Sequence, residues 1–372
     1  MTYFITLIFS FFFLYIFYGN YTLTNNKREM SKSALSFVLF IPAFYWLLVL
    51  GLQYYVGTDY PTYYKYFDTG TDLGLYLRKR EYAFYFVAQF VYKSFLPAQA
   101  GFFLISFIQI LFLCKFCLYL KFDRPDIFIV IYFCCATCFY NQMNAIRQYT
   151  AMAIFLYASV FIYERKLKKY IIYILFASMF HFSAIILLML YPFSFLFNLK
   201  SSKWYKLFLI LSLFLMYKGM DNFITFFVSK SSYAAYLDSF YFLEQNRKSF
   251  KNIITKLVFL PFYFRVMAWL PKYMEIYSKK DVFFIKMGTV FYGIKLIAFS
   301  SFFLSRFAMY FDLLAYVPLY YYLRELISHY AIKKWARILE LVLFLSISVG
   351  LWIAKVLIAP TGEYLYNSVL FN

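Results

Sequence analysis

The sequence predicts an all-α, polytopic integral membrane protein with about 11–12 transmembrane helices and one further interfacial or re-entrant helix at the outer face. Of its 372 residues, 64% are apolar and 15% are charged, whereas a soluble domain has about 45–50% and about 25%. The apolar residues form runs long enough to cross a bilayer, and the basic residues cluster between them. This composition excludes a soluble enzyme and a disordered chain.

Eleven apolar runs follow one another along the chain, and a weaker twelfth follows a long polar loop at 81–96. The eleven runs lie near 2–19, 34–52, 101–120, 127–141, 145–163, 170–197, 204–219, 253–270, 283–300, 307–323 and 337–356. No internal repeat and no linker divides them. Residues 1–372 are therefore predicted to form a single multi-pass membrane domain.

Basic connectors predict the orientation of the spans. Lysine and arginine number 37 against 17 acidic residues, a net charge of +20, and most of the excess lies between apolar runs. The six basic connectors are 26–33, 121–126, 164–169, 199–206, 271–280 and 324–337. Positively charged loops stay in the cytoplasm. Both termini are then predicted outside, with long outer loops at about 53–100 and 220–252.

Two segments take unusual forms under this rule. Only one span fits between an outer loop at 53–80 and an inner loop at 121–126, so the weaker run 81–96 is predicted to be an interfacial or re-entrant helix. The run 170–197 has basic clusters at both ends and must cross twice. We therefore predict a hairpin of two short or tilted segments with its apex near residues 181–183.

Ionisable residues collect at the outer ends of the predicted spans. A charge within or beside a span is costly and marks a candidate functional site. The residues placed there are Asp59, Arg78, Arg80, Glu81, Arg147, His181 and Arg306. The positive-inside rule does not explain them. They predict a site on the outer face.

The motif at residues 57–64 combines a turn with aromatic side chains. Asp59 either caps the helix that follows or takes part in chemistry. Tyr60 and Tyr63 either anchor that helix at the interface or stack on sugars. Both alternatives are open for each residue.

Arg147 interrupts a long apolar stretch. It either pairs with a carboxylate or binds a phosphate through its planar guanidinium. No acidic residue lies within eight positions on either side, which favours an external anion. Arg306 opens a later span, where it either snorkels to the interface or supplies a second guanidinium on the same face. With the basic residues 78–80, these two arginines suit a pyrophosphate.

His181 lies alone in an apolar stretch. It is either a hydrogen-bonded packing residue or a general base, the role for which histidine is best matched near neutral pH. His329 lies in a basic connector predicted to be inside and is interpreted as a solvated residue that takes no part in the site. The five cysteines lie within apolar runs and are interpreted as buried packing thiols; these are Cys114, Cys117, Cys134, Cys135 and Cys138. No metal site and no cleavable signal peptide are predicted.

Taken in order, these motifs resemble the EpsG-type branch of the Wzy-like polysaccharide polymerases. The segments that carry the resemblance are 57–67, 81–84, 144–154, 180–186 and 305–311. It extends from about residue 45 to the C-terminus. Two departures are Gln53, where the family commonly has arginine nearby, and Tyr82-Ala83-Phe84, where it has a Pro-Gly-Phe-like sequence.

The resemblance implies a membrane glycosyltransferase that polymerises undecaprenyl-pyrophosphate-linked oligosaccharide repeat units. An acceptor sugar hydroxyl attacks the anomeric carbon of the lipid-pyrophosphate donor on the outer face of the bacterial inner membrane. His181 is then the expected base, with Asp59 and Glu81 as alternatives. The residues expected to bind pyrophosphate or sugar are Arg147, Arg306, Gln148, Tyr60, Tyr63, Arg80 and Tyr310.

The expected partners are the lipid-linked oligosaccharide donor and acceptor and the membrane lipids, with a chain-length regulator and a flippase as further candidates. No cofactor, metal or nucleic acid is expected. The main alternative is a transporter or flippase of lipid-linked oligosaccharides, which the absence of a repeat and the one-sided charges disfavour. A membrane acyltransferase using His181 and a structural assembly partner are further alternatives.

Overall fold

The computed structural model describes residues 2–25, 31–218, 257–299, 302–328, 334–358 and 365–370, and the isolated positions 226, 229 and 255. Helices make up 84% of the structure, and the described part of the chain contains no strand. The all-α prediction is confirmed. The chain divides into two compact units, Met1–Pro192 with His329–Asn372, and Phe193–Ser328. The prediction of a single domain stays a prediction, and the outer loop 220–252 lies outside the described residues apart from the isolated positions.

Each apolar run predicted from the sequence contains helix. The first unit holds α1 (Thr2–Asn25), α2 (Lys32–Gly51), α3 (Tyr60–Thr69), α4 (Gly74–Arg78), α5 (Tyr82–Lys93), α6 (Gln99–Leu120), α7 (Pro125–Val130), the π-helical η1 (Ile131–Cys135), α8 (Cys138–Asn144), α9 (Ile146–Tyr163), α10 (Leu167–Ser178), the 3₁₀ helix η2 (Phe182–Leu190) and α19 (Lys334–Ile358). The second holds α11 (Ser202–Lys218), α15 (Leu260–Ile276), α16 (Lys279–Ala298), α17 (Phe302–Ala308), η5 (Met309–Phe311) and α18 (Asp312–Ser328), with η3 (Pro192–Asn198) at the boundary.

Four of the described helices are long and apolar enough to cross a membrane. They are α1, α2, α6 and α19, and the pair Pro125–Cys135 and Cys138–Asn144, bent by 50°, makes a fifth if it is counted as one span. Large apolar side chains on these helices are exposed, among them Phe12, Phe37 and Phe40 at 54–65%. Such a surface suits lipid, and an integral membrane protein is confirmed. The remaining predicted crossings, and the orientation, stay predictions.

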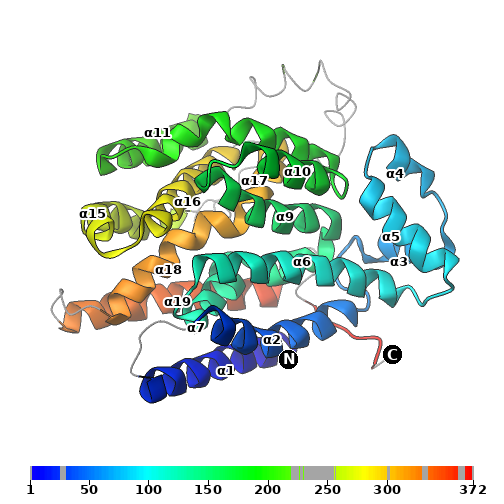
Figure 1. The fold of residues 1–372 in the computed structure, drawn as a ribbon, viewed down its shortest axis with the longest axis horizontal. Coiled ribbons are helices and arrows are strands. Elements are labelled where there is room, and N and C mark those ends of the chain that lie inside the picture. Colours follow the sequence, from blue (N-terminus) through cyan, green and yellow to red (C-terminus); the bar gives the residue numbers. More distant parts are fainter. Residues whose placement is uncertain are drawn as a thin grey trace. The chain divides into compact units, whose positions relative to one another are not determined.

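The weaker run 81–96 forms α5, a helix of only 12 residues. At about 1.5 Å per residue it is roughly 18 Å long, well short of the roughly 30 Å hydrocarbon core. Helices α3, α4 and α5 gather at one end of α6 (Figure 1). Tyr60 stacks on Phe102 of α6 with 4.8 Å between ring centroids, and Phe67 packs against Phe84 and Phe102. The loop predicted to be outer, at about 53–100, therefore folds into a small helical layer.

The predicted hairpin after α9 is present. Helix α10 ends at Ser178, and η2 packs back against it. The Tyr170 hydroxyl of α10 donates a hydrogen bond to the Leu187 carbonyl of η2 at 2.5 Å. The chain turns at residues 179–181, so His181 lies at the apex as predicted.

A segment near the C-terminus packs against the base of the loop at 53–100. The Tyr54 N–H donates to the Asn367 carbonyl at 3.0 Å, and the Val369 N–H donates to the Leu52 carbonyl at 3.1 Å. The Tyr366 hydroxyl donates to the Val49 carbonyl at 2.9 Å. Residues 365–370 therefore hold the end of α2 just before the motif at 57–64 begins.

Candidate functional site

Three helix ends in the first unit bring the candidate site together. Glu81 stands at the start of α5, Arg147 in the first turn of α9, and His181 at the turn between α10 and η2. Helix α9 starts where α8 ends, at Ala145, whose non-helical backbone separates the two. Helix α5 starts after Arg80, which has a left-handed backbone (φ 61°) that ends the preceding turn. The interruptions between consecutive helices therefore position each of the three side chains.

Glu81 is the centre of the cluster. Its side chain is 3% exposed, and both carboxylate oxygens have partners. Oε2 forms an ion pair with Nη1 of Arg147. Oε1 lies 3.0 Å from Nδ1 of His181 and accepts a hydrogen bond from the Phe182 N–H at 3.3 Å. A buried carboxylate is stable only when it is paired and hydrogen-bonded, and this one meets both conditions.

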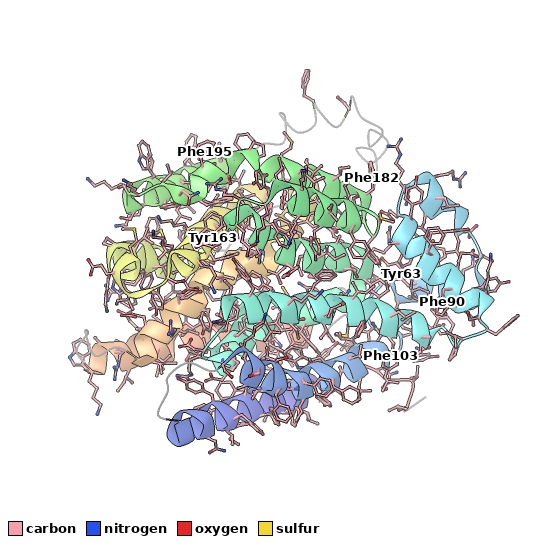
Figure 2. The ribbon with its side chains drawn as sticks, in the orientation of Figure 1. Tyr63, Phe90, Phe103, Tyr163, Phe182 and Phe195 are labelled. Carbon is pink, nitrogen blue, oxygen red and sulfur yellow. The ribbon has the colours of Figure 1, made fainter. Side chains whose placement is uncertain are left out.

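Aromatic rings enclose the Arg147 guanidinium. It lies 4.9 Å from the centre of the Tyr76 ring and 5.7 Å from that of Phe84. Its Nε donates to the Tyr63 hydroxyl at 3.4 Å. A guanidinium over ring faces is stabilised by cation–π attraction, more so when water is excluded. Figure 2 shows Tyr63 at the end of the first unit where Phe182 also lies.

The structure gives Arg147 a carboxylate partner within the protein. The sequence favoured an external anion because no acidic residue lies within eight positions. Arg147 instead pairs with Glu81, 66 positions earlier in the chain. Local sequence reports only the neighbours along one helix, whereas helix ends far apart in the chain meet in the folded protein. Of the two roles left open for Arg147, pairing with a carboxylate is observed.

The pKa of Glu81 determines the protonation of the cluster. Burial alone would raise it, but the hydrogen bond from His181, the charge of Arg147 and the Phe182 N–H together lower it below its ordinary value. Burial raises the pKa of Tyr63 despite the nearby arginine, so its hydroxyl stays protonated. An ionised carboxylate only accepts hydrogen bonds. Nδ1 of His181 is therefore the donor, and a neutral His181 carries its lone pair on Nε2.

Helix α5 and the hairpin turn hold each other in place. The first N–H groups of a helix lack partners within it. Here Ala83 and Phe84 donate theirs to the Met179 carbonyl, at 2.9 and 3.4 Å. In return, Glu81 at the start of α5 accepts the N–H of Phe182 at the start of η2. Helix α5 and the hairpin turn thus provide acceptors for each other's otherwise unpaired backbone N–H groups, which fixes the spacing between Glu81 and His181.

The turn before α3 is tied to the break between α8 and α9. Oδ1 of Asn144 accepts hydrogen bonds from the Asp59 N–H at 2.9 Å and from the Thr58 hydroxyl at 3.4 Å. Gly57 has φ +79°, and a Cβ there would lie 2.6 Å from the same Oδ1. The motif therefore needs glycine for both its backbone and its close approach to Asn144.

Gly57→Ala is expected to destabilise the protein by about 1–3 kcal/mol, because alanine is strained at positive φ and collides with Asn144. Thermal unfolding of the purified protein in detergent measures this. Gly74→Ala is the matched control in the same loop, since a Cβ there meets nothing within 4 Å. Equal melting temperatures for the two variants would contradict the tight turn.

Several predicted residues are placed around the cluster. Tyr60 is buried, and its hydroxyl accepts a hydrogen bond from Gln99 at 2.8 Å, which favours the anchoring role. Asp59 begins α3 but makes no side-chain cap. Gln148 follows Arg147 in α9 and is half-buried. Arg80 is exposed, and its guanidinium lies 5.6 Å from the centre of the Phe182 ring, beside His181.

Two predicted residues belong to the second unit. Arg306 is exposed on α17, and Tyr310 lies in η5 with a ring that is 1% exposed. The two units are each described by themselves. A shared role for Arg306 and Arg147 therefore stays a prediction.

Sequence reasoning missed three members of the site. These are the ring of Tyr76, the carbonyl of Met179 and the N–H of Phe182. The last two are backbone groups, and Tyr76 lies in the short α4, so no side-chain pattern marks them. The described residues contain no group of three or more His, Cys, Asp or Glu placed to hold a metal ion.

The fold and the cluster define the class: an α-helical integral membrane protein in which Arg147 and His181 meet a buried Glu81 at the ends of helices. The chain belongs to the EpsG family, whose family model matches residues 36–368. This is a family of Wzy-like polysaccharide polymerases, and the match spans every segment of the cluster. No curated protein and no solved structure matches the chain.

Proposed function

We propose that the protein is a glycosyltransferase that polymerises undecaprenyl-pyrophosphate-linked oligosaccharide repeat units on the outer face of the bacterial inner membrane. The hydroxyl of an incoming repeat unit attacks the anomeric carbon of the growing chain. The carbon–oxygen bond to the lipid pyrophosphate breaks, and the pyrophosphate leaves with that bonding pair. The hydroxyl proton passes to a base. Membership of the EpsG family supports polysaccharide polymerisation, and the Glu81–His181 pair supports the chemistry.

His181 is the proposed base, and its bond to Glu81 is the observation that carries the proposal. Glu81 accepts a hydrogen bond from the Nδ1–H group of His181, so Nε2 of the neutral ring carries no hydrogen and is able to take a proton from the acceptor hydroxyl. The carboxylate then stabilises the imidazolium that forms. Glu81 is thus assigned to orient His181 rather than to serve as a base itself. Asp59 stays the alternative base because it begins α3 one turn before Tyr63, whose N–H donates to the Asp59 carbonyl at 3.2 Å.

Arginine side chains are proposed to offset the charge of the leaving pyrophosphate. Arg147 uses Nη1 for Glu81 and Nε for Tyr63, which leaves further N–H donors in a partly exposed group. Arg80 is exposed beside Phe182 and adds a positive charge close to His181. Fixed cations at the position where negative charge develops lower the barrier. Arg306 is proposed as a further contributor from the second unit.

A gel of lipid-linked glycans from cells with and without the gene tests the function. Loss of the long-chain ladder, while single repeat units still reach the outer leaflet, is the expected result. Restoration of the ladder by the wild-type gene is the control. Repeat units trapped on the inner leaflet would instead establish a flippase.

Cysteine labelling tests the orientation. Thr62→Cys in α3 is expected to react with a membrane-impermeant maleimide in intact cells, and Lys168→Cys only after permeabilisation. Both positions are exposed, and four of the five native cysteines are buried, so unmodified protein serves as the background control. The reverse pattern would place the cluster in the cytoplasm and overturn the proposed orientation.

A further inference from the structure

A cavity of about 370 Å³ lies in the first unit, at the end of α9 away from Arg147. Its walls include the aromatic rings of Tyr119, Tyr157, Phe161 and Tyr173. The 17 residues from Arg147 to Glu164 correspond to about 25 Å of helix, close to the thickness of a bilayer core. Figure 2 shows Tyr163, the last residue of α9, far from Tyr63. The cavity therefore lies at the opposite end of α9 from the Glu81 cluster.

Positive charge exceeds negative charge around this cavity. Glu164, the one acidic residue in its wall, is paired with Lys166 at 2.7 Å and hydrogen-bonded by Tyr119. Lys169 also lines the cavity, and its ammonium lies 5.7 Å from the centre of the Phe161 ring. Lys115 of α6 is not part of the wall but lies beside it, with its ammonium 5.8 Å from the centre of the ring of Tyr157, which does line the cavity. Because Glu164 is paired with Lys166, two further positive charges are left, Lys169 in the wall and Lys115 beside it.

Lys115 is the unusual member of this group. It lies inside the apolar helix α6, where an ammonium is costly. Among the described residues, neither Lys115 nor Lys169 has a carboxylate within ion-pair distance, and both instead lie over aromatic rings. Cation–π contacts hold an ammonium in place without neutralising its charge. Such lysines are ready to bind an anion.

One wall of the cavity is apolar and faces outward. Ile172 of α10 lines it and is 64% exposed, and Leu175, one turn further, is 44% exposed. The cavity therefore combines lysine and tyrosine side chains with an exposed apolar rim. A soluble phosphate ester needs only the first part, whereas a phospholipid uses both.

We infer that this cavity binds the phosphate headgroup of an anionic phospholipid in the leaflet opposite the Glu81 cluster, the cytoplasmic leaflet in the proposed orientation. The phosphate lies between Lys115 and Lys169, the tyrosine rings enclose the headgroup, and an acyl chain follows Ile172. The inference needs no substrate at the Glu81 cluster. It is independent of the proposed function.

Native mass spectrometry of the full-length protein in detergent tests this site, with dioleoyl-phosphatidylglycerol as the probe. The double variant Lys115→Gln, Lys169→Gln is expected to weaken binding of the first lipid at least about tenfold, because two charge-assisted contacts are lost. Lys168→Gln is the matched control: it removes an exposed lysine from the same connector but not from the cavity wall. Its affinity should equal that of the wild type.

Three outcomes would overturn the inference. Equal weakening in Lys168→Gln would indicate general surface charge, and equal binding of dioleoyl-phosphatidylethanolamine would show that no anionic site exists. Displacement of the lipid by equimolar glycerol 1-phosphate would assign the cavity to a soluble phosphate ester. Thermal unfolding confirms that each variant is folded. If the double variant unfolds, Lys169→Gln alone is used, with an expected loss of about threefold.

Discussion

Replacing His181 with alanine is expected to lower the rate of polymer formation by about 10²–10⁴-fold, the contribution of a positioned general base. The protein should still insert and fold, because His181 is partly exposed and its removal leaves Glu81 paired with Arg147 and Phe182. The measurement is the length distribution of lipid-linked glycans in cells that produce the variant at wild-type levels. Accumulated single repeat units should replace the ladder.

His181→Gln separates proton transfer from hydrogen bonding. A glutamine amide can donate to Glu81 as Nδ1 does, but it cannot take a proton from a sugar hydroxyl. It should therefore be as inactive as His181→Ala while unfolding at the wild-type temperature. A long-chain ladder from either variant would remove His181 from the mechanism and make Asp59 the base. Asp59→Asn would then be the variant to examine.

Replacing Glu81 with glutamine is expected to destabilise the protein by about 3–5 kcal/mol, because Arg147, whose side chain is only 18% exposed, loses its counter-charge. The double variant Glu81→Gln, Arg147→Met should recover most of this loss, since an apolar side chain needs no partner. Glu164→Gln is the control, because that carboxylate is 24% exposed and its ion pair with Lys166 contributes at most about 1 kcal/mol. Thermal unfolding in detergent measures all three.

The Glu81–Arg147 pair also predicts how the stability of the folded protein depends on pH. The pKa of Glu81 is lowered in the folded protein, so its ionised form favours folding. This contribution is complete above the unfolded pKa of about 4.5 and is lost as the pH falls through the lower folded pKa. The difference in unfolding temperature between wild type and Glu81→Gln should therefore shrink below pH 4.5. A constant difference would show that Glu81 carries no charge in the folded protein.

Much of the fold follows from hydropathy and charge alone. Apolar runs locate the helices because each must satisfy its own backbone in lipid. Basic clusters at both ends of the run 170–197 predicted the hairpin after α9, and the structure has this hairpin with His181 at its turn. The other basic clusters predicted that 81–96 is too weak for a span, and α5 is indeed too short.

The site was harder to predict because its key contacts cross large separations. Glu81, Arg147 and His181 were each selected for their charge or chemistry near the outer ends of helices, and they meet. Their pairing was not foreseen, since periodicity describes one helix and carries no information on which ends touch. Backbone groups such as the Met179 carbonyl are the same in every residue and leave no mark in a sequence. Residues 365–370 likewise show no pattern that connects them with the outer loop.

Residues 365–370 can contact the end of α2 only after most of the chain has been synthesised. The bond from Tyr366 to Val49 joins positions 317 residues apart. A ribosome adding about 5–20 residues per second needs roughly 15–60 s to make that stretch. Helices α2 and α6, which precede and follow the loop that holds Asp59 and Glu81, are thus synthesised long before residues 366–369 pair with the end of α2. Until then the end of α2 and residues 52–54 lack the hydrogen bonds that residues 366–369 provide.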